Sequence, residues 1–354
     1  MKRILSVVAL AVFCMFAVGV LFAGGQSDAA SAAKKDLQFV AVLYGQANEG
    51  TWEPAAFTAI QKVQKDFPFT LQLAESTTTQ DAEKVIRNWA SRGVDVLFAH
   101  SLIYMDQLIT VAKQFPKVHF IGEAMLNPDE NLDDPEYLKQ SSKNTPANLT
   151  VLGDTPYEGN FLAGYVAGLM TKSKKIGILE PFESPGLNRY SNCFYYGVKA
   201  ANPSVEMKIV YLGDYVAPAE TRDAVKSFAQ QGCDIVFSEM DDNSAILEAQ
   251  AQGIYCIPMY MDKTQVAPET VLTSVVFDWY KPLKGSVEAV VKGTMAAYRQ
   301  KNYFRGLTVK DDSIYLGKYA SSVPQKVKDA AEKIRKQLKD GSLTFPLVTD
   351  VIIK

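Results

Sequence analysis

The chain has 354 residues, and its 37 Lys and Arg nearly balance its 39 Asp and Glu, so the formal net charge is only −2. It contains no basic run or patch, which argues against nucleic acid or an anionic membrane surface as a partner. Beyond the N-terminus no apolar stretch is long enough to span a membrane, and about 315 ordered residues exceed what one hydrophobic core usually organises, so two lobes are expected.

The N-terminus has the pattern of a secretory signal peptide. Lys2 and Arg3 precede an apolar run that ends at Ala23, and small and polar residues follow. A membrane anchor is the alternative for such a run, but the flanking residues favour cleavage. A lipoprotein would need a Cys directly after the run, whereas Cys14 lies inside it. We therefore predict a signal peptide over residues 1–23, a flexible leader over 24–35, and a soluble protein exported to the periplasm or cell surface.

The mature chain begins with alternating strand and helix patterns. The apolar run at 39–44 is typical of a strand buried on both faces of a parallel sheet. A helical apolar period follows over 55–67, with Thr51 as a candidate cap. Further elements are expected in chain order: a strand at 70–74, a helix at 82–90 ended by Gly93, and strands at 94–98 and 118–121. This alternation predicts right-handed βαβ crossovers and a doubly wound sheet.

The second half of the chain repeats the first. Residues 81–98 and 221–237 each contain a helical pattern, a Gly stop, an Asp and a buried strand. Two similar halves predict an α/β fold of two doubly wound, three-layer α/β/α lobes with a cleft between them.

Ligands of open parallel sheets bind outside the carboxyl ends of the strands. The segments that follow the predicted strands are therefore the candidate cleft. They are 46–52, 100–104, Glu123, 181–185, 239–243 and 261–263. Most of them carry an aromatic residue or an acid, as a ligand pocket would.

Three cysteines remain once the signal peptide is removed: Cys193, Cys233 and Cys256. Their odd number and the absence of a CxxC spacing argue against a metal site or a disulfide framework. We expect buried, reduced thiols, with a single bridge from Cys233 to Cys193 or to Cys256 left open for an oxidising compartment. No metal or cofactor is expected.

The segment Gly159-Asn160-Phe161-Leu162-Ala163-Gly164-Tyr165-Val166-Ala167-Gly168-Leu169-Met170-Thr171-Lys172, followed by Lys175-Ile176-Gly177, resembles the basic membrane protein family of ABC-transporter substrate-binding lipoproteins. Weaker matches at 83–87, 101–106, 200–203, 267–276 and 340–343 follow in the same order, so the resemblance spans nearly the whole mature chain. It implies a type I periplasmic binding protein fold with a multi-strand hinge, and purine nucleosides or adenine as ligands. The implied lobes are 36–153 plus about 276–303, and 154–275 plus about 304–354.

The residues near the first strand favour one branch of this family. After the first strand, the nucleoside-binding branch has a pattern like Asp-Lys-Ser-Phe-Asn, whereas this chain has Asn48-Glu49-Gly50-Thr51-Trp52-Glu53. Where that branch carries a Lys, this chain has Phe277-Asp278-Trp279. Adenine or a related base is therefore favoured over a nucleoside. A sugar or autoinducer-type receptor and a sensory binding protein are the alternatives.

Trp52 is the expected stacking surface for a flat heteroaromatic ring. Phe277 and Trp279 are two residues apart, and only one of them is expected to face the cleft, with Trp279 preferred. Asp242 and Asp262 are expected to accept hydrogen bonds from ligand N–H groups, and Asp241 is the alternative to Asp242. The remaining candidates are Tyr104, Tyr157, Ser101 and Glu49.

We expect no catalysis. The only histidines are His100 and His119, and the sequence has no GxSxG motif, metal-ligand cluster or phosphate loop. A repressor of the same fold would need an N-terminal DNA-binding helix-turn-helix, where this chain has an export signal. The predicted mechanism is hinge closure on the ligand, with Trp52 in one lobe and Asp242 and Asp262 in the other. The predicted partners are the small-molecule ligand and an ABC permease, and the protein is expected to be a monomer.

Overall fold

The computed structural model describes residues 36–124, 143 and 145–353. The chain divides into residues 1–35 and a compact unit over 36–354. The predicted signal peptide and leader lie outside the described residues. Within the part that is described, no helix combines the length and the apolar character needed to cross a membrane.

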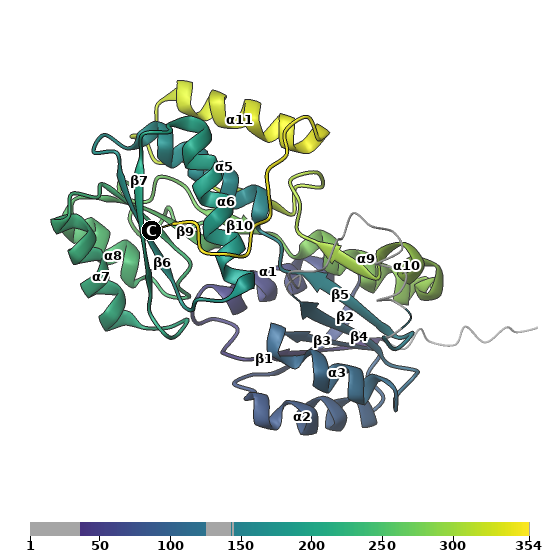
Figure 1. The fold of residues 1–354 in the computed structure, drawn as a ribbon. Helices are drawn as coiled ribbons and strands as arrows, with labels where there is room; N and C mark the ends of the chain where they lie inside the picture. The colour runs from purple at the N-terminus through teal and green to yellow at the C-terminus, as the bar shows by residue number, and fades with distance from the viewer. Residues whose placement is uncertain (1–35, 125–142, 144, 354) are drawn as a thin grey trace, which may run out of the picture. The chain divides into compact units, whose positions relative to one another are not determined.

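The first sheet is wholly parallel and has the strand order β11-β5-β4-β3-β1-β2. Its strands are β1 (Leu37–Leu43), β2 (Phe69–Ala74), β3 (Val96–His100), β4 (His119–Ala124), β5 (Leu149–Gly153) and β11 (Phe304–Gly306). Its helical segments are α1 (Trp52–Asp66), α2 (Thr79–Ser91), the 3-10 turn η1 (Leu102–Tyr104), α3 (Met105–Ala112), α9 (Tyr280–Val291) and α10 (Met295–Asn302). Alternate β1 residues pack on opposite sides, Val40 with α2 and α3 and Phe39 with α1 and α9, which gives the three layers seen in Figure 1.

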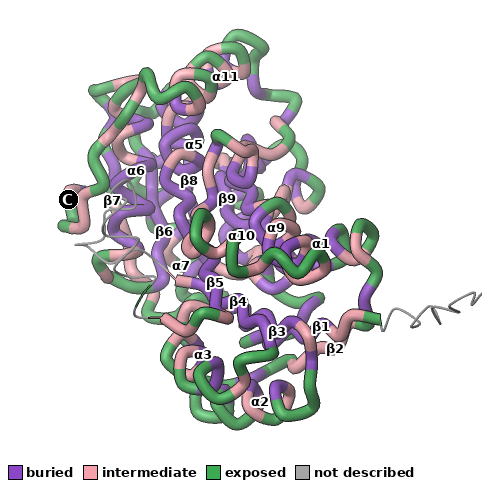
Figure 2. Tube along the Cα trace, turned by 90° about the vertical axis from the view of Figure 1, so that its right-hand side faces the viewer, coloured by how far each residue is buried: buried purple, intermediate pink, exposed green. Residues whose placement is uncertain are grey.

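The second sheet has the order β12-β10-β9-β8-β6-β7, and only the pairing of β10 with β12 is antiparallel. Its strands are β6 (Lys175–Glu180), β7 (Glu206–Tyr211), β8 (Ile235–Ser238), β9 (Tyr255–Tyr260), β10 (Val275–Phe277) and β12 (Ile314–Leu316). Its helices are α5 (Tyr157–Met170), α6 (Pro185–Ala201), α7 (Pro218–Gln230), α8 (Ser244–Gln252) and α11 (Gln325–Asp340). One face packs on α7 and α8 and the other on α5 and α6, and Figure 2 shows the strands of both sheets buried beneath more exposed helices.

Both sheets follow the same path, which confirms the predicted two-lobe α/β fold. In each, the second strand lies on one side of the first strand and the third strand lies on the other. The repeated halves are α2–β3 and α7–β8, and the predicted glycine stops Gly93 and Gly232 have φ of 74° and 83°. The path reverses between β1 and β3 and between β6 and β8, and such switch points are where open α/β sheets bind ligands.

The predicted crossing points of the chain, at about 276 and about 304, lie on two short strands. The predicted return to the first lobe at 276 falls inside β10, which pairs with β9 in the second sheet, and the predicted exit at 304 falls on β11, which pairs with β5 in the first. Each crossing strand has three residues, too few to show a hydrophobic period. The helical segment that follows β10 is split into α9 and α10 near Gly293, whose φ is 65°. The lobe boundaries themselves stay a prediction.

The glycines of the family-like segment allow α5 and α6 to approach each other closely. A Cβ on Gly164 would lie 2.0 Å from the Phe194 carbonyl oxygen, and one on Gly197 would lie 1.9 Å from that of Phe161. Only glycine fits at such a crossing. The segment that carries the resemblance therefore shapes the scaffold of the second lobe.

Cys193, Cys233 and Cys256 are buried and unpaired, as predicted. Burial raises the pKa of each thiol, so these side chains behave as small apolar groups.

Candidate ligand-binding site

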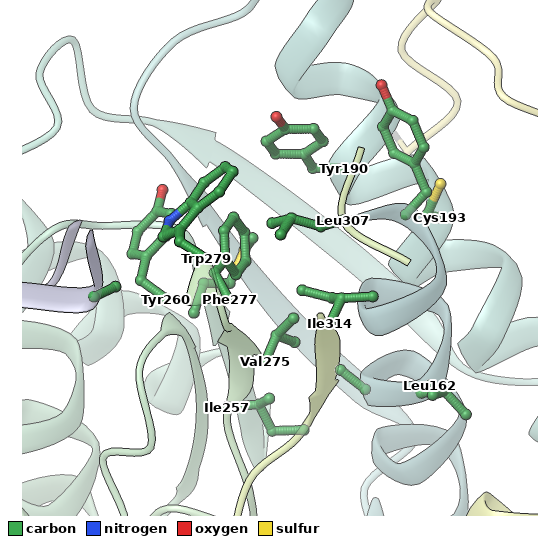
Figure 3. Close-up of a cluster of buried hydrophobic side chains, with 14 of the residues drawn as sticks. Leu162, Tyr190, Cys193, Ile257, Tyr260, Val275, Phe277, Trp279, Leu307 and Ile314 are labelled. Atoms are coloured by element: carbon green, nitrogen blue, oxygen red, sulfur yellow. The ribbon is translucent and has the colours of Figure 1, made fainter. Parts of the chain in front are cut away.

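Trp52 stands at the centre of an aromatic group that draws on both sheets. Its indole stacks on the His100 ring, with centroids 4.7 Å apart and planes at 10°. Tyr260, Trp279 and Phe277 meet it edge to face at centroid distances of 5.3, 5.8 and 6.1 Å. Figure 3 shows the latter three grouped at the ends of the second sheet's strands. The aromatic group therefore joins α1 and β3 of the first sheet to β9 and the end of β10 in the second.

His100 is fully buried and is held by two carboxylates. Its Nδ1 binds the Glu123 carboxylate, its Nε2 lies 3.2 Å from the Trp52 carbonyl oxygen, and Glu53 approaches Nε2 at 3.8 Å. Burial alone would lower the pKa of His100, but the Glu123 charge overrides it and raises the pKa to about 9. The imidazole is therefore a cation at neutral pH, and its face lies against the electron-rich face of Trp52.

Glu53 ties the loop before α1 to this cation. It is 4% exposed, and burial raises its pKa, against which the His100 charge acts. One carboxylate oxygen accepts the Gly45 N–H at 2.7 Å. The loop that carries Trp52 is thus fixed at both ends.

Asp241, which follows β8 of the second sheet, caps α1 of the first sheet. Its Oδ1 accepts from the Thr51 N–H at 2.6 Å, the Thr51 hydroxyl at 2.5 Å and the Trp52 N–H at 2.7 Å. Burial raises the pKa of Asp241, and these hydrogen bonds act against that rise. Gly50, with φ of 74°, lets the loop pass, since a Cβ there would lie 3.0 Å from Asp241 Oδ2. A carboxylate at a helix N-terminus satisfies its free N–H groups. Because Asp241 follows a strand of the second sheet and α1 packs on the first, these hydrogen bonds join the two lobes beside Trp52.

A second group of acids lies on the other side of Tyr260. Asp154 follows β5, Glu180 ends β6 and Glu239 follows β8, and all three are at most 2% exposed. Burial raises the pKa of Asp154 to about 7 and of Glu180 to about 8, and it raises the pKa of Glu239 well above its usual value. The hydroxyls of Tyr190 and Tyr260 donate to the backbone oxygens of Asp154 and Glu239, at 2.9 and 3.0 Å, and leave the carboxylates free.

Three of the predicted site residues come together: Trp52, Trp279 and Phe277. Only one of the last two was expected to face the cleft, yet both rings contact Trp52. β10 ends at Phe277, so strand alternation no longer governs Trp279. Trp279 is fully buried, and its Nε1 has no hydrogen-bond partner.

The other predicted site residues lie apart from this aromatic group in contacts of their own. Asp242 accepts the Ser244 N–H at 2.6 Å at the start of α8, and Asp262 accepts the Lys318 N–H at 3.2 Å. The Tyr104 hydroxyl donates to the Thr77 carbonyl oxygen, and Ser101 caps η1. Tyr157 packs near Tyr190 at 5.9 Å, and Glu49 is exposed in a turn. Their roles in binding stay predictions.

Some residues of the site had no predicted role, and Asp241 had one only as the alternative to Asp242. His100, Glu123, Glu239 and Asp241 fell within the predicted cleft segments, but Glu180, Asp154 and Tyr260 did not. The signal for Glu180 was an acid that ends a buried apolar strand, and it was missed because the cleft was expected to begin one residue later.

Two surface cavities of about 580 and 610 Å³ lie elsewhere. The first opens at the amino ends of β4 and β5 near His119 and Asn148, and the second lies beside α11 near Asp312 and Arg335. Neither is lined by Trp52 or by the buried acids.

A family model described as "ABC transporter substrate-binding protein PnrA-like" matches residues 38–342. A purine-binding protein of Brucella abortus is 28% identical over 263 residues, 74% of this chain and 69% of the relative. A protein of Haloferax volcanii named as an ABC transporter glucose-binding protein is 24% identical over 293 residues, 82% of this chain and 69% of the relative. Among solved structures, a solute-binding protein of an ABC transporter system from Conexibacter woesei has a TM-score of 0.73 at 20% identity, covering 89% of this chain and all of that one.

Proposed function

The chain belongs to the PnrA-like family of ABC transporter substrate-binding proteins, and from this premise we propose that it is an exported receptor that binds a purine-type ligand, adenine or a related base, beside Trp52. It delivers this ligand to an ABC permease in the membrane and performs no chemistry on it.

The observation that carries the proposal is the setting of Trp52. A flat heteroaromatic ring gains about 1–3 kcal/mol per base by stacking on an aromatic side chain. Trp52 is held in one orientation by His100 and by the Asp241 cap, at the switch point of the first sheet. The name of the Brucella abortus relative supports a purine as the ligand.

Ligand binding would act through closure of the two lobes. Trp52 belongs to the first sheet's α1, whereas Asp241, Tyr260 and Trp279 follow strands of the second. A ligand that contacts both sides favours the closed arrangement by its difference in affinity for the two states. The Asp241 cap on α1 stabilises the same arrangement.

A sugar is the second candidate ligand, and one observation favours it. Buried carboxylates commonly accept hydrogen bonds, and hydroxyl groups can supply the donors, so Asp154, Glu180 and Glu239 suit a sugar as well as an amine. The name of the Haloferax volcanii relative points the same way.

A thermal-shift screen tests the proposal. The protein is heated with adenine, hypoxanthine, guanine, adenosine, inosine, ribose and glucose, each in excess. A ligand at 100 times its Kd adds about 2.7 kcal/mol to stability, which raises Tm by a few degrees. We expect a purine to stabilise the wild type.

The same screen is run on Trp52→Ala and on a control, Trp89→Ala. Trp89 lies on α2 and packs under Arg92 at 4.5 Å, away from the aromatic group. The purine shift should vanish in Trp52→Ala and persist in Trp89→Ala. Stabilisation by ribose or glucose alone would leave the receptor and overturn the purine.

A further inference from the structure

The carboxyl groups of Glu180 and Glu239 meet at the switch point of the second sheet. β6 and β8 are adjacent, with Leu179 opposite Ser238, so the two acids follow neighbouring positions at the carboxyl edge. β7 lies on the far side of β6, so the path of the sheet reverses between these strands. This is the position that His100 occupies at the end of β3 in the first sheet, and open α/β sheets bind ligands there.

These carboxylates lack the partners that buried charges require. Glu180 and Glu239 are 0% exposed, and in the described part of the chain none of their four carboxylate oxygens has a hydrogen-bond partner; Asp154 Oδ1 also has none there. Ser191 lies close enough to Glu180 to act against the rise of its pKa, but not in hydrogen-bonding geometry. No cation forms an ion pair with any of the three over residues 36–124 and 145–353.

An unpaired buried carboxyl group costs about 1–3 kcal/mol even when it is neutral, and more when it is charged. Glu180 and Glu239 lie at the carboxyl edge of the second sheet and Asp154 follows β5 of the first, and the three are close enough for their charges to interact. Three such groups together would destabilise the fold by several kcal/mol, at about 1–3 kcal/mol each. Their missing partners must be donors, supplied either by protons on the carboxyls themselves or by a molecule that binds there.

The acids are continuous with the aromatic group. The ring of Tyr260 lies 5.3 Å from that of Trp52, and its hydroxyl donates to the Glu239 carbonyl oxygen at 3.0 Å. The ring of the fully buried Trp279 also meets Trp52 edge to face, and its Nε1 donor has no partner among the described residues. A molecule stacked on Trp52 would thus lie near two kinds of unused group: the carboxylates beside Tyr260, which can accept hydrogen bonds, and Trp279 Nε1, which can donate one.

We propose that Asp154, Glu180 and Glu239 form a second subsite, continuous with Trp52, which takes the edge of a heterocycle that carries exocyclic amino groups. The proposal rests on the proposed function and specifies which purines fit. Amino N–H groups donate to the carboxylates, and a ring nitrogen on another edge can accept from Trp279 Nε1.

Binding to this subsite is linked to protons. Burial raises the pKa of Asp154 to about 7 and of Glu180 to about 8, and it raises the pKa of Glu239 well above its usual value, so at neutral pH the carboxyls hold protons in part. An amino group that donates to them favours the ionised form. Each carboxyl that ionises releases its proton to the buffer, and affinity should rise with pH until these groups are fully ionised.

The test is a series of three probes that differ only in amino groups: purine, adenine and 2,6-diaminopurine. Calorimetry at neutral pH, in two buffers of different ionisation enthalpy, gives both the Kd and the number of protons released. We expect affinity to rise roughly tenfold with each amino group, since a hydrogen bond to a charged acceptor contributes about that much. Proton release should rise along the same series.

Glu239→Gln and Glu180→Gln should each flatten the series and reduce the proton count, because a neutral amide keeps the shape but not the titrating carboxylate. Glu248→Gln is the matched control. Glu248 is a buried acid of α8 in the same lobe whose carboxylate accepts from Gln252, and its variant should bind the series as the wild type does.

The outcomes separate the two proposals. If none of the three probes binds the wild type, the purine assignment fails. If all three bind equally and release no protons, or if the series persists in both Gln variants, the second subsite is wrong while the purine receptor stands. Even if a variant does not fold, proton release by the wild type still tests the second subsite: release that rises along the series supports it, and no release overturns it.

Discussion

Two groups of buried acids lie near the carboxyl ends of the strands of the two sheets, and their electrostatics are opposite. In the first lobe, Glu53 and Glu123 lie on either side of the His100 cation. In the second, Glu180 and Glu239 lie side by side with no cation in the described structure. In the first group each carboxylate has one hydrogen-bonded oxygen, on Gly45 N–H for Glu53 and on His100 for Glu123, and the group holds Trp52. The second is incomplete, which is what a site that selects its ligand requires.

The largest effect should come from removing the cation of the first group. His100→Ala leaves Glu123 buried without its partner, and breaking a buried pair in this way costs about 3–5 kcal/mol. Urea denaturation at neutral pH measures the loss. The control is His119→Ala, because burial lowers the pKa of His119 to about 3 and its ring makes a single hydrogen bond, to Thr150.

The pH dependence of this difference has a definite sign. The pKa of His100 rises from 6.5 unfolded to about 9 folded, so its stabilisation is complete below 6.5 and is lost as pH rises through 9. The gap between wild type and His100→Ala should therefore narrow above pH 9. If His100→Ala and His119→Ala lost equal free energy of unfolding at neutral pH, the charge of His100 would not be what stabilises the first group of acids. The contrast between the two groups would then disappear.

The second group should respond in the opposite direction. Glu239→Gln is expected to raise the free energy of unfolding by about 1–3 kcal/mol in mildly alkaline solution, because it removes an unpaired buried carboxyl that must ionise. Glu123→Gln should lower the free energy of unfolding, because it removes the carboxylate that pairs with His100 in the first lobe. Chemical denaturation of both variants makes the comparison, and a loss of stability in Glu239→Gln would show that its carboxylate has a partner after all.

The shifts in pKa between the unfolded and folded states determine the pH at which this gain in stability appears. The folded pKa of Glu180 is raised from 4.5 to about 8, so its carboxyl favours folding fully below pH 4.5 and loses that contribution as pH rises through 8. The folded pKa of Glu239 is raised in the same direction, so the advantage of Glu239→Gln over the wild type should be small at the usual pKa of a Glu and should grow as pH rises.

The fold could be predicted from the sequence because its signals are local. Buried parallel strands appear as continuous apolar runs, and the glycine stops of α2 and α7 appear at the same place in both halves. The lobe crossings were less predictable because β10, β11 and β12 have only three residues each. Trp52 could be named as a candidate because its segment stands where the related family carries its pattern after the first strand, and its role in binding stays a prediction.

For the acids of the site, the sequence predicted only the segments that contain them and not the individual residues. His100 and Glu123 are 23 residues apart, and their contact depends on the packing and register of β3 against β4. Asp241 and Asp242 are adjacent, and which of them reaches α1 is decided by the backbone after β8. In sequence, a lone acid such as Glu180 at a strand end is indistinguishable from a solvated one.

A smaller effect should come from the cap that joins the two lobes. Asp241→Ala removes three hydrogen bonds to the start of α1 and should cost about 1–2 kcal/mol. It should also weaken purine binding, because Trp52 loses one of its anchors. Asp242→Ala is the control, since its carboxylate bonds only the nearby Ser244 N–H. Thermal denaturation and calorimetry on both variants test this, and a larger loss of binding in Asp242→Ala would restore the original assignment of that residue to the ligand.

The smallest expected signal reports the first group directly, without a ligand. A protonated imidazole stacked on an indole quenches its fluorescence, so Trp52 emission should rise as His100 loses its proton with a midpoint near 9. Trp89 and Trp279 supply a background, and both His100→Gln and Trp52→Phe should abolish the transition. A midpoint at the ordinary histidine value of about 6.5 would mean that Glu53 and Glu123 do not hold the cation. Neither group of acids would then hold a cation at neutral pH, and the second group would no longer be the only one that awaits a ligand.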